Sequence, residues 1–479
     1  MTTVSRLYSA YKDSGVDWLC EIPKHWELPR LALVLEERRE VNIDREVTRV
    51  LSVVRDRGVI PYEERGNMGN KKSDDITRYK VVRPNDIVVN SMNVIIGSVG
   101  VSRFSGCLSP VYYVLKTRWP SNRPEYFDAV FKVKPFQRSL SRIGNGILAH
   151  RMRISMNLLK CERVPRPPTD EQVAIVRYLS AADASISRFI RNRRRLIALL
   201  NEQKQAIINQ AVTRGLDPNV RLKPSGVDWL GEIPEHWEVR KLKYLVSFSG
   251  GGTPAKAVER YWRGDIPWVS PKDMKCPMIT DASDHISAQA LESCAGSLVE
   301  PDALLLVVRS GILRRTIPTA INAVSVAINQ DMKALRPVGS LSTEYLKLLI
   351  DGCSNRLLFE WTKSGATVES IEHEYLANTM MPVPPLDEQA DIVAHADKES
   401  GPIATTIDLT VRQVDLVREY RTRLISDVVT GKVDVRGLAP MSEEEPIEPE
   451  AMEEDADSDD VPEDEEPGMD EGEGDVADQ

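Results

Sequence analysis

The sequence predicts a mixed α/β protein in which one plan is used twice: a short leader motif, a globular domain with small β-sheets, and a long helical arm. A fourteen-residue motif recurs at the start of each half, a Pro-Pro-led helical segment recurs at its end, and short β-prone runs fill the stretches between them. The 479 residues suffice for two or three domains with cores of their own. We therefore expect two pseudo-repeated domains, two long helices packed against each other as a coiled coil, and a disordered acidic C-terminal tail.

The leader motif reads SGVDWLCEIPKHWE at 14–27 and SGVDWLGEIPEHWE at 225–238, so twelve of fourteen positions are identical. The second half is six residues longer between leader and arm, as variable loops on a common scaffold would produce. His25 and His236 lie beside Trp and Pro, without a nearby Cys or second His. We expect both to be packed structural histidines rather than metal ligands or catalytic groups.

The two helical arms begin with Pro-Pro-x-Asp-Glu-Gln at Pro167 and at Pro384. Pro is tolerated in the first turn of a helix, and acidic residues are favourable there. In both arms apolar residues recur at alternating steps of three and four, as a coiled-coil seam requires, and the shared phase favours mutual packing over two unrelated amphipathic helices. The seam contains Ile186, Ile190, Ile197, Leu200, Ile207 and Ala211 in the first arm, interrupted by Arg193 and Lys204, and Ile403, Ile407, Thr410, Val414, Val417, Arg421, Leu424 and Val428 in the second. Ser400-Gly401-Pro402 is expected to break or kink the second arm.

Charge is distributed unevenly along the chain. Residues 441–479 contain 20 Asp or Glu and no Lys or Arg. The rest of the chain therefore contains 52 of the 72 acidic residues and all 62 basic residues, so it is mildly basic. The tail cannot bury enough apolar area to order itself and is expected to be a solvated, disordered segment rather than a DNA mimic. The mildly basic remainder permits contact with nucleic acid but also suits proteins that bind none.

Several other classes of protein are disfavoured by the sequence. No apolar run reaches the ~20 residues of a membrane span, and residues 1–10 lack the apolar stretch of a signal peptide, so we expect a cytoplasmic protein without membrane contact. The six Cys are scattered without any Cys-x-x-Cys pair, which disfavours a zinc site or a disulfide framework. The expected boundaries are 1–166 for the first domain, 167–215 for the central arm, 216–383 for the second domain, 384–437 for the C-terminal arm and 438–479 for the tail.

Polar residues follow predicted strands in both globular stretches. Residues 79–91 predict strand, turn and strand, and Asn90, Ser91 and Asn93 at their end are placed to face a ligand. In the second stretch, the triple glycine 250–252 lacks the Gly-Lys-Ser/Thr ending of a nucleotide-binding loop. We interpret it as a turn where the backbone comes close to another group.

The motifs together carry a family resemblance. They are GGTP at 251–254 with GDIPWV at 264–269, INQD at 328–331, GCLSPVY at 106–112, and the twice-used arm start. From residue 14 to about 437 the chain resembles the specificity subunit of type I restriction-modification systems. The resemblance implies two target recognition domains that each read one half of a bipartite, asymmetric site in double-stranded DNA. It also implies that the arms pair antiparallel, set the spacing, and dock two modification (methyltransferase) subunits in a complex with restriction/translocase subunits. No cofactor is expected in this chain, whereas S-adenosylmethionine, ATP and Mg are expected on the partner subunits.

Base reading in DNA needs paired donors and acceptors, such as Asn or Gln for adenine and Arg or Lys for guanine, while phosphate contacts supply affinity without sequence information. We expect phosphate contacts from Lys71, Lys72, Lys256 and Lys272. The other candidate DNA-binding residues are Asn67, Asn90, Ser91, Asn93, Asn145, His150, Arg151, Thr253, Trp268, Ser270, Arg309, Ser310, Arg314, Arg315, Gln330, Lys363 and Thr367.

The alternative function is a DNA methyltransferase or nuclease with its own fused recognition domain. An adenine methyltransferase would need an Asn/Asp-Pro-Pro-aromatic motif, and neither Pro167-Pro168-Thr169 nor Pro384-Pro385-Leu386 supplies it. No nuclease carboxylate cluster or helicase phosphate loop is visible, and a coiled-coil scaffold without a DNA role would not explain two elaborated domains. We therefore expect no catalytic and no metal-binding residues in this chain, and catalysis by its partners.

Overall fold

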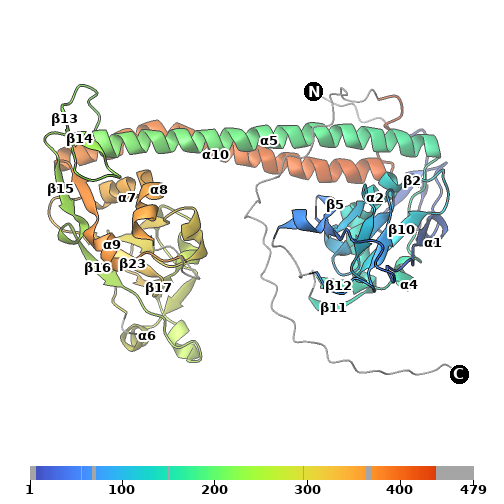
Figure 1. The fold of residues 1–479 in the computed structure, drawn as a ribbon, viewed down its shortest axis with the longest axis horizontal. Helices are drawn as coiled ribbons and strands as arrows, with labels where there is room; N and C mark the ends of the chain where they lie inside the picture. Colours follow the sequence, from blue (N-terminus) through green and yellow to red (C-terminus); the bar gives the residue numbers. More distant parts are fainter. Residues whose placement is uncertain are drawn as a thin grey trace. The chain divides into compact units, whose positions relative to one another are not determined.

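The structure is a computed structural model that describes residues 7–55, 57–66, 72–148, 151–294, 296–362 and 369–438, without the side chains of 146–148 and 151. Its contacts divide the chain into two compact units (Figure 1). Unit 1 takes the residues up to Arg191 and those from Val414 on, and unit 2 takes Asn192–Gln413. Each unit thus combines one globular domain with part of both helical arms. The predicted acidic tail lies outside the described residues.

Unit 1 contains small sheets and short helices. Its largest sheet has the strand order β3-β10-β7-β8, with antiparallel pairing throughout, and four two-stranded sheets surround it. The strands are β1 (Tyr11–Asp13), β2 (Glu21–Pro23), β3 (Leu35–Glu37), β4 (Leu51–Val54), β5 (Gly58–Pro61), β6 (Lys80–Val82), β7 (Ile87–Asn90), β8 (Val99–Val101), β9 (Gly106–Leu108), β10 (Tyr112–Thr117), β11 (Gly144–Leu148) and β12 (Arg151–Ile154). The helices are α1 (Leu31–Val34), α2 (Pro124–Phe131), α3 (Lys134–Leu140) and α4 (Met156–Leu159). The strand-turn-strand prediction for residues 79–91 is confirmed by β6 and β7.

Unit 2 has a five-stranded sheet, β16-β23-β20-β21-β18, and a three-stranded sheet, β19-β17-β22. The strands are β13 (Leu222–Pro224), β14 (Glu232–Pro234), β15 (Glu238–Lys241), β16 (Val246–Gly250), β17 (Ile266–Val269), β18 (Met278–Ile279), β19 (Asp284–Ile286), β20 (Leu304–Val307), β21 (Thr319–Asn322), β22 (Ala327–Ile328), β23 (Met332–Pro337) and β24 (Met380–Val383). The helices are α6 (Ala288–Ser293), α7 (Thr343–Gly352), α8 (Ser354–Trp361) and α9 (His373–Asn378), and short 3-10 turns include η4 (Leu242–Tyr244), η6 (Pro271–Asp273) and η7 (Gly311–Arg314). All four residues of β20 are buried, which explains its continuous apolar sequence.

The two arms are the longest helices, α5 (Thr169–Arg214) and α10 (Leu386–Val429). Both begin where the Pro-Pro motif predicts, with two acidic residues in the first turn. Their ends belong to the domain cores: Ile175 and Val428 are fully buried in unit 1, and Val212 and Ile392 in unit 2. This is why the arms do not separate from the globular domains as bodies of their own.

Inside unit 1, three seam residues form a buried apolar cluster: Ile186, Ile190 and Val414. Beside them Arg421 of α10 pairs with Asp183 of α5 at 2.6 Å. An Arg in the seam is therefore accommodated by a carboxylate of the facing helix.

Of the break or kink predicted at Pro402, the break is wrong, because α10 continues through this residue as one helix; a kink there stays a prediction. Pro402 and Lys398, whose carbonyl loses its i+4 donor, are both exposed, so water can satisfy that carbonyl. The Thr406 hydroxyl also donates to the Pro402 carbonyl at 2.8 Å.

Across the described part of the chain, every helix is too short or too polar to cross a bilayer.

Candidate nucleic-acid interface

The leader of unit 1 is fixed to α5 by the buried carboxylate of Glu171, which is 4% exposed. It accepts hydrogen bonds from the Trp26 indole at 2.8 Å and the Tyr8 hydroxyl at 3.2 Å. His25 contacts it at 2.6 Å and Arg436 at 3.3 Å. Burial and the neighbouring Glu171 carboxylate raise the pKa of Tyr8. The Asp-Glu-Gln motif thus anchors the leader, and His25 is a structural link.

The same bond recurs in unit 2, where His236 contacts Glu388 at 2.8 Å. There the carboxylate is 25% exposed, and the buried Trp237 indole has no partner among the described protein atoms. The identical motif therefore builds a weaker junction in unit 2.

The glutamine after each of these carboxylates is buried and orients a domain segment. Gln172 accepts from the Arg123 backbone at 2.9 Å, just before α2. Gln389 accepts from the Ser342 backbone at 2.9 Å, just before α7. The arms thereby fix the helices that support each domain's sheet.

In unit 2 the triple glycine forms the tight approach that its sequence predicts. A Cβ on Gly251 would lie 1.9 Å from the Ile328 carbonyl oxygen, so no other residue fits without a shift. The Gly252 backbone donates to that carbonyl at 3.0 Å and accepts from the Trp268 indole at 3.0 Å. This packing holds the loop after β16 against the end of β22.

The loop places an exposed polar cluster at the ends of β16, β20 and β22. The Thr253 hydroxyl is hydrogen-bonded to the exposed Gln330 side chain. Arg309, 53% exposed, pairs with Asp331 at 2.6 Å, and Asn329 donates to the same carboxylate at 3.3 Å. An amide, a hydroxyl and a guanidinium on one rim can supply donors and acceptors to base edges. Sequence reasoning missed Asp331, whose carboxylate orients Arg309.

Other predicted residues of unit 2 lie on the surrounding loops. Lys272 pairs with Asp284 at 2.7 Å, and Arg314 with Glu369 at 3.4 Å. Lys256 and Arg315 are exposed, and the Ser310 hydroxyl caps η7 by accepting from Ile312.

Three predicted contact residues are buried and already bonded, which corrects their role. Trp268 is 7% exposed and packs in a small apolar cluster, and Ser270 is 6% exposed and caps η6. Ser91 in unit 1 is 1% exposed and donates to the Val111 carbonyl at 2.6 Å. These side chains position loops and are not presented to a ligand, a distinction that residue type alone does not make.

In unit 1, Asn90 and Asn93 lie at the end of β7, and Asn90 accepts from the Met92 backbone at 3.1 Å. The hairpin of β11 and β12 lies next to them, since the Ile154 backbone donates to the Ser91 carbonyl at 2.9 Å. Asn145 is exposed on this hairpin opposite Arg153. The backbone of Arg151 belongs to β12, and its side chain is outside the described set.

Lys72 lies near an aromatic ring with a second cation. Its ammonium is 5.7 Å from the Tyr62 ring centroid, and Arg65 lies 4.2 Å over the same ring. Asn67, Lys71, His150, Lys363 and Thr367 lie outside the described residues.

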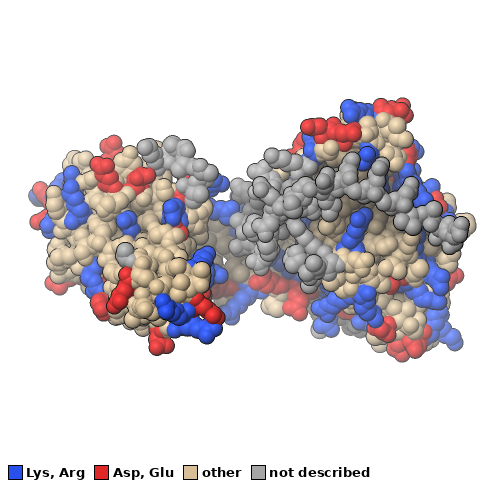
Figure 2. Space-filling model, turned by 90° about the horizontal axis from the view of Figure 1, so that it is seen from below, with Lys and Arg blue, Asp and Glu red and all other residues tan. Residues whose placement is uncertain are grey.

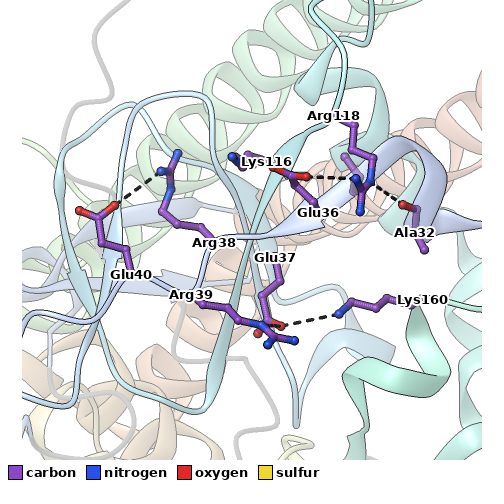
Figure 3. Close-up of a pocket in the computed structure, with 10 residues that line it drawn as sticks. Ala32, Glu36, Glu37, Arg38, Arg39, Glu40, Lys116, Arg118 and Lys160 are labelled. Atoms are coloured by element: carbon purple, nitrogen blue, oxygen red, sulfur yellow. Dashed lines mark hydrogen bonds and ion pairs between the residues drawn. The ribbon is translucent and has the colours of Figure 1, made fainter.

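A groove in unit 1 has a volume of about 530 Å³ and lies beside β3 and β10 (Figure 3). Its charged side chains pair with one another: Glu36 with Lys116 at 2.6 Å and with Arg118 at 3.2 Å, and Glu37 with Lys160 at 3.9 Å. The bond from Lys116 lowers the pKa of Glu36. Because its charges are mutually compensated, this groove is a poor site for a phosphate.

Basic and acidic side chains are interspersed over the visible surface of each unit, without one single-sign face (Figure 2). Within the described residues there is no group of three His, Cys, Asp or Glu side chains that could hold a metal ion.

Residues 234–398 match the family model of the type I restriction modification DNA specificity domain. The EcoR124I/EcoR124II specificity subunit of Escherichia coli is 31% identical over 217 residues, covering 44% of this chain and 51% of the relative. The chain thus matches about half the length of this relative. The MjaVIII specificity subunit of Methanocaldococcus jannaschii is 23% identical over 448 residues, covering 87% of this chain and 95% of the relative.

Among solved structures, one on complex assembly and conformational transition of the type I R-M system has a TM-score of 0.59 at 17% identity, covering 85% of this chain and 98% of that one. It shows a similar fold. The resemblance to type I specificity subunits that the motifs predict is confirmed, and these relatives are named as specificity subunits.

Proposed function

We propose that this protein is the sequence-specific DNA-binding specificity subunit of a type I restriction-modification complex, and that each domain reads one half of a bipartite, asymmetric site. The observation that carries the proposal is that the two units share one anchoring scheme but present different rims. The His-Glu bond and the buried Gln recur, whereas one rim offers Asn90, Asn93 and Asn145 and the other offers Thr253, Arg309 and Gln330. A common frame with different polar ends suits the reading of two different sequences.

The helical arms, in this proposal, set the distance between the half-sites and dock two modification subunits. The Ile186–Val414 cluster and the Asp183–Arg421 pair support antiparallel packing of α5 and α10. Restriction subunits would complete the complex, and S-adenosylmethionine, ATP and Mg would be bound by the partners.

Methylation profiling tests the proposal directly. DNA from cells that carry this chain with its modification subunit is expected to show methylation at one two-part site with a fixed gap. Exchange of residues 28–166 for another recognition domain should change one half-site and leave the gap unchanged. Methylation, cleavage or ATP hydrolysis by the isolated, contaminant-free chain would contradict the proposal.

A further inference from the structure

Each unit exposes three large apolar side chains, two of them at equivalent positions in its domain and the third displaced by one residue. In unit 1 they are Leu33, Trp119 and Leu158, with 61%, 56% and 45% exposed; in unit 2 they are Tyr244, Val338 and Tyr375, with 63%, 58% and 47% exposed. We call each set the apolar end patch of its unit.

Backbone hydrogen bonds establish the equivalence. In unit 1, Arg118 donates to the Val34 carbonyl at 3.0 Å; in unit 2, Val338 donates to the Leu245 carbonyl at 2.7 Å. These bonds join the residue after β10 or β23 to the end of α1 or η4. Each patch therefore combines the start of its domain with the end of a central strand.

The third residue of each patch is brought in by a second pair of bonds. Leu31 donates to the Glu162 carbonyl at 2.7 Å, beyond α4, and Leu242 donates to the Thr379 carbonyl at 2.9 Å, beyond α9. Leu158 lies on α4 and Tyr375 on α9. In addition, the Trp119 indole donates to the Leu33 carbonyl at 3.3 Å, so these two residues are in contact.

The register of the central strands places each patch away from the proposed DNA-reading rim. β10 begins at Tyr112, opposite Asn90, and Trp119 follows its far end. In unit 2, Val307 lies two residues before Arg309 and pairs with Met332, the first residue of β23. Val338 follows the last residue of the same strand, so it lies at the opposite end. Six residues at ~3.3 Å each put about 20 Å between rim and patch. The patch thus stays accessible while the rim meets DNA.

The chemistry of the patches fits protein and not nucleic acid. Exposed aliphatic and aromatic side chains that gather at one place mark protein interaction sites. Beside the unit 1 patch, Arg118 is already paired with Glu36 at 3.2 Å. Beside the unit 2 patch, Lys243 bonds to Asn378 at 2.9 Å and lies 5.3 Å from the Tyr244 ring centroid. At each patch the named cation is therefore already engaged by neighbouring side chains of this protein.

We infer that each apolar end patch is a docking surface for one copy of the modification subunit, in addition to the helical arms. A surface that occurs once in each repeat suits an occupant that is present twice. This inference rests on the proposed function, which requires two modification subunits on one chain. The acidic composition of residues 441–479 makes that segment a poor cover for an apolar surface.

The experiment uses the full chain and the modification subunit of the same system. The variants are Leu33→Glu with Leu158→Glu in unit 1, and Tyr244→Glu with Tyr375→Glu in unit 2. The controls are Ile43→Glu and Met278→Glu, which alter residues 70% and 54% exposed outside the patches. Native mass spectrometry counts the bound subunits, titration gives their affinity, and DNA binding and thermal unfolding are measured on the chain alone.

We expect each patch variant to lower the affinity for one of the two modification subunits by roughly tenfold or more. The control variants should bind two subunits as tightly as the unaltered chain does. Thermal unfolding and DNA binding of the chain alone should stay unchanged. Patch variants that bind two subunits as tightly as the controls would overturn the docking inference and leave the proposed function intact. Loss of DNA binding would make the patch a DNA surface, and loss of self-association would make it an interface between copies of this chain; either result overturns the inference. Failure of the unaltered chain to bind the subunit overturns both proposals.

Discussion

Replacing the repeated glutamates Glu171 and Glu388 by Ala should have unequal effects, although both stand in the same motif. Loss of Glu171 leaves the buried Trp26 indole and the Tyr8 hydroxyl without their acceptor. Each unsatisfied buried group costs about 1–3 kcal/mol, and breaking a buried charged contact costs about 3–5 kcal/mol. We therefore expect unit 1 to lose about 3–5 kcal/mol of stability with Glu171→Ala.

The equivalent change in unit 2 removes a bond between His236, 48% exposed, and Glu388, 25% exposed. Such exposed pairs contribute about 0–1 kcal/mol. For a body of about 200 residues, the loss of stability in unit 1 corresponds to a fall in Tm of roughly 6–20 °C, whereas the Tm of unit 2 should fall by a few degrees at most.

Hydrogen exchange followed by mass spectrometry is the appropriate assay, because a chain with two units has no single free energy of unfolding. Glu171→Ala should reduce protection in peptides of unit 1, and Glu388→Ala should change unit 2 little. Equal losses of protection in the two units would refute the reasoning from burial and bonding partners.

Three further predictions concern the arms, the glycine loop and pH. Insertion of seven residues into each arm keeps the seam in phase and adds ~10 Å, so methylation profiling should show a gap longer by up to about three base pairs at ~3.4 Å each; altered half-sites with a fixed gap would mean that the arms read DNA. Gly251→Ala should displace the loop from Ile328 and weaken binding to the second half-site roughly tenfold or more, whereas Gly311→Ala, where a Cβ meets open space, should not; equal band-shift affinities of the two variants would contradict this. Burial alone would raise the pKa of Asp273, but hydrogen bonds from Ser283 and Ser270 lower this pKa by more than burial raises it, so the net shift is downward. The stability that it contributes to η6 is therefore present above the usual Asp pKa of about 3.9 and lost as pH falls through the lower folded value. Asp273→Asn should remove that dependence in an acid titration followed by NMR, and an unchanged titration would disprove the assignment.

The sequence by itself determined the features that depend on local pattern. The Pro-Pro-x-Asp-Glu-Gln starts located α5 and α10, because Pro and acidic residues suit the first turn of a helix. The alternation of β-prone runs and turns located β6 and β7, and the triple glycine located a close backbone approach at Gly251. The combination of motifs also predicted the resemblance to type I specificity subunits that the comparisons show.

Only the tertiary structure decided which polar side chains remain available and how strongly the repeats are anchored. Ser91, Trp268 and Ser270 are of residue types that contact DNA, yet all three are buried. Ser91 and Trp268 are hydrogen-bonded to residues remote in sequence, and Ser270 is bonded to the adjoining turn. Pro402 is tolerated because its face of α10 meets solvent, which a local pattern does not specify. Glu171 and Glu388 occupy identical motifs, but Arg436, 265 residues further along the chain, reaches the first of them. Such contacts depend on which segments meet in space, and that is decided by packing of the whole unit rather than by the motif.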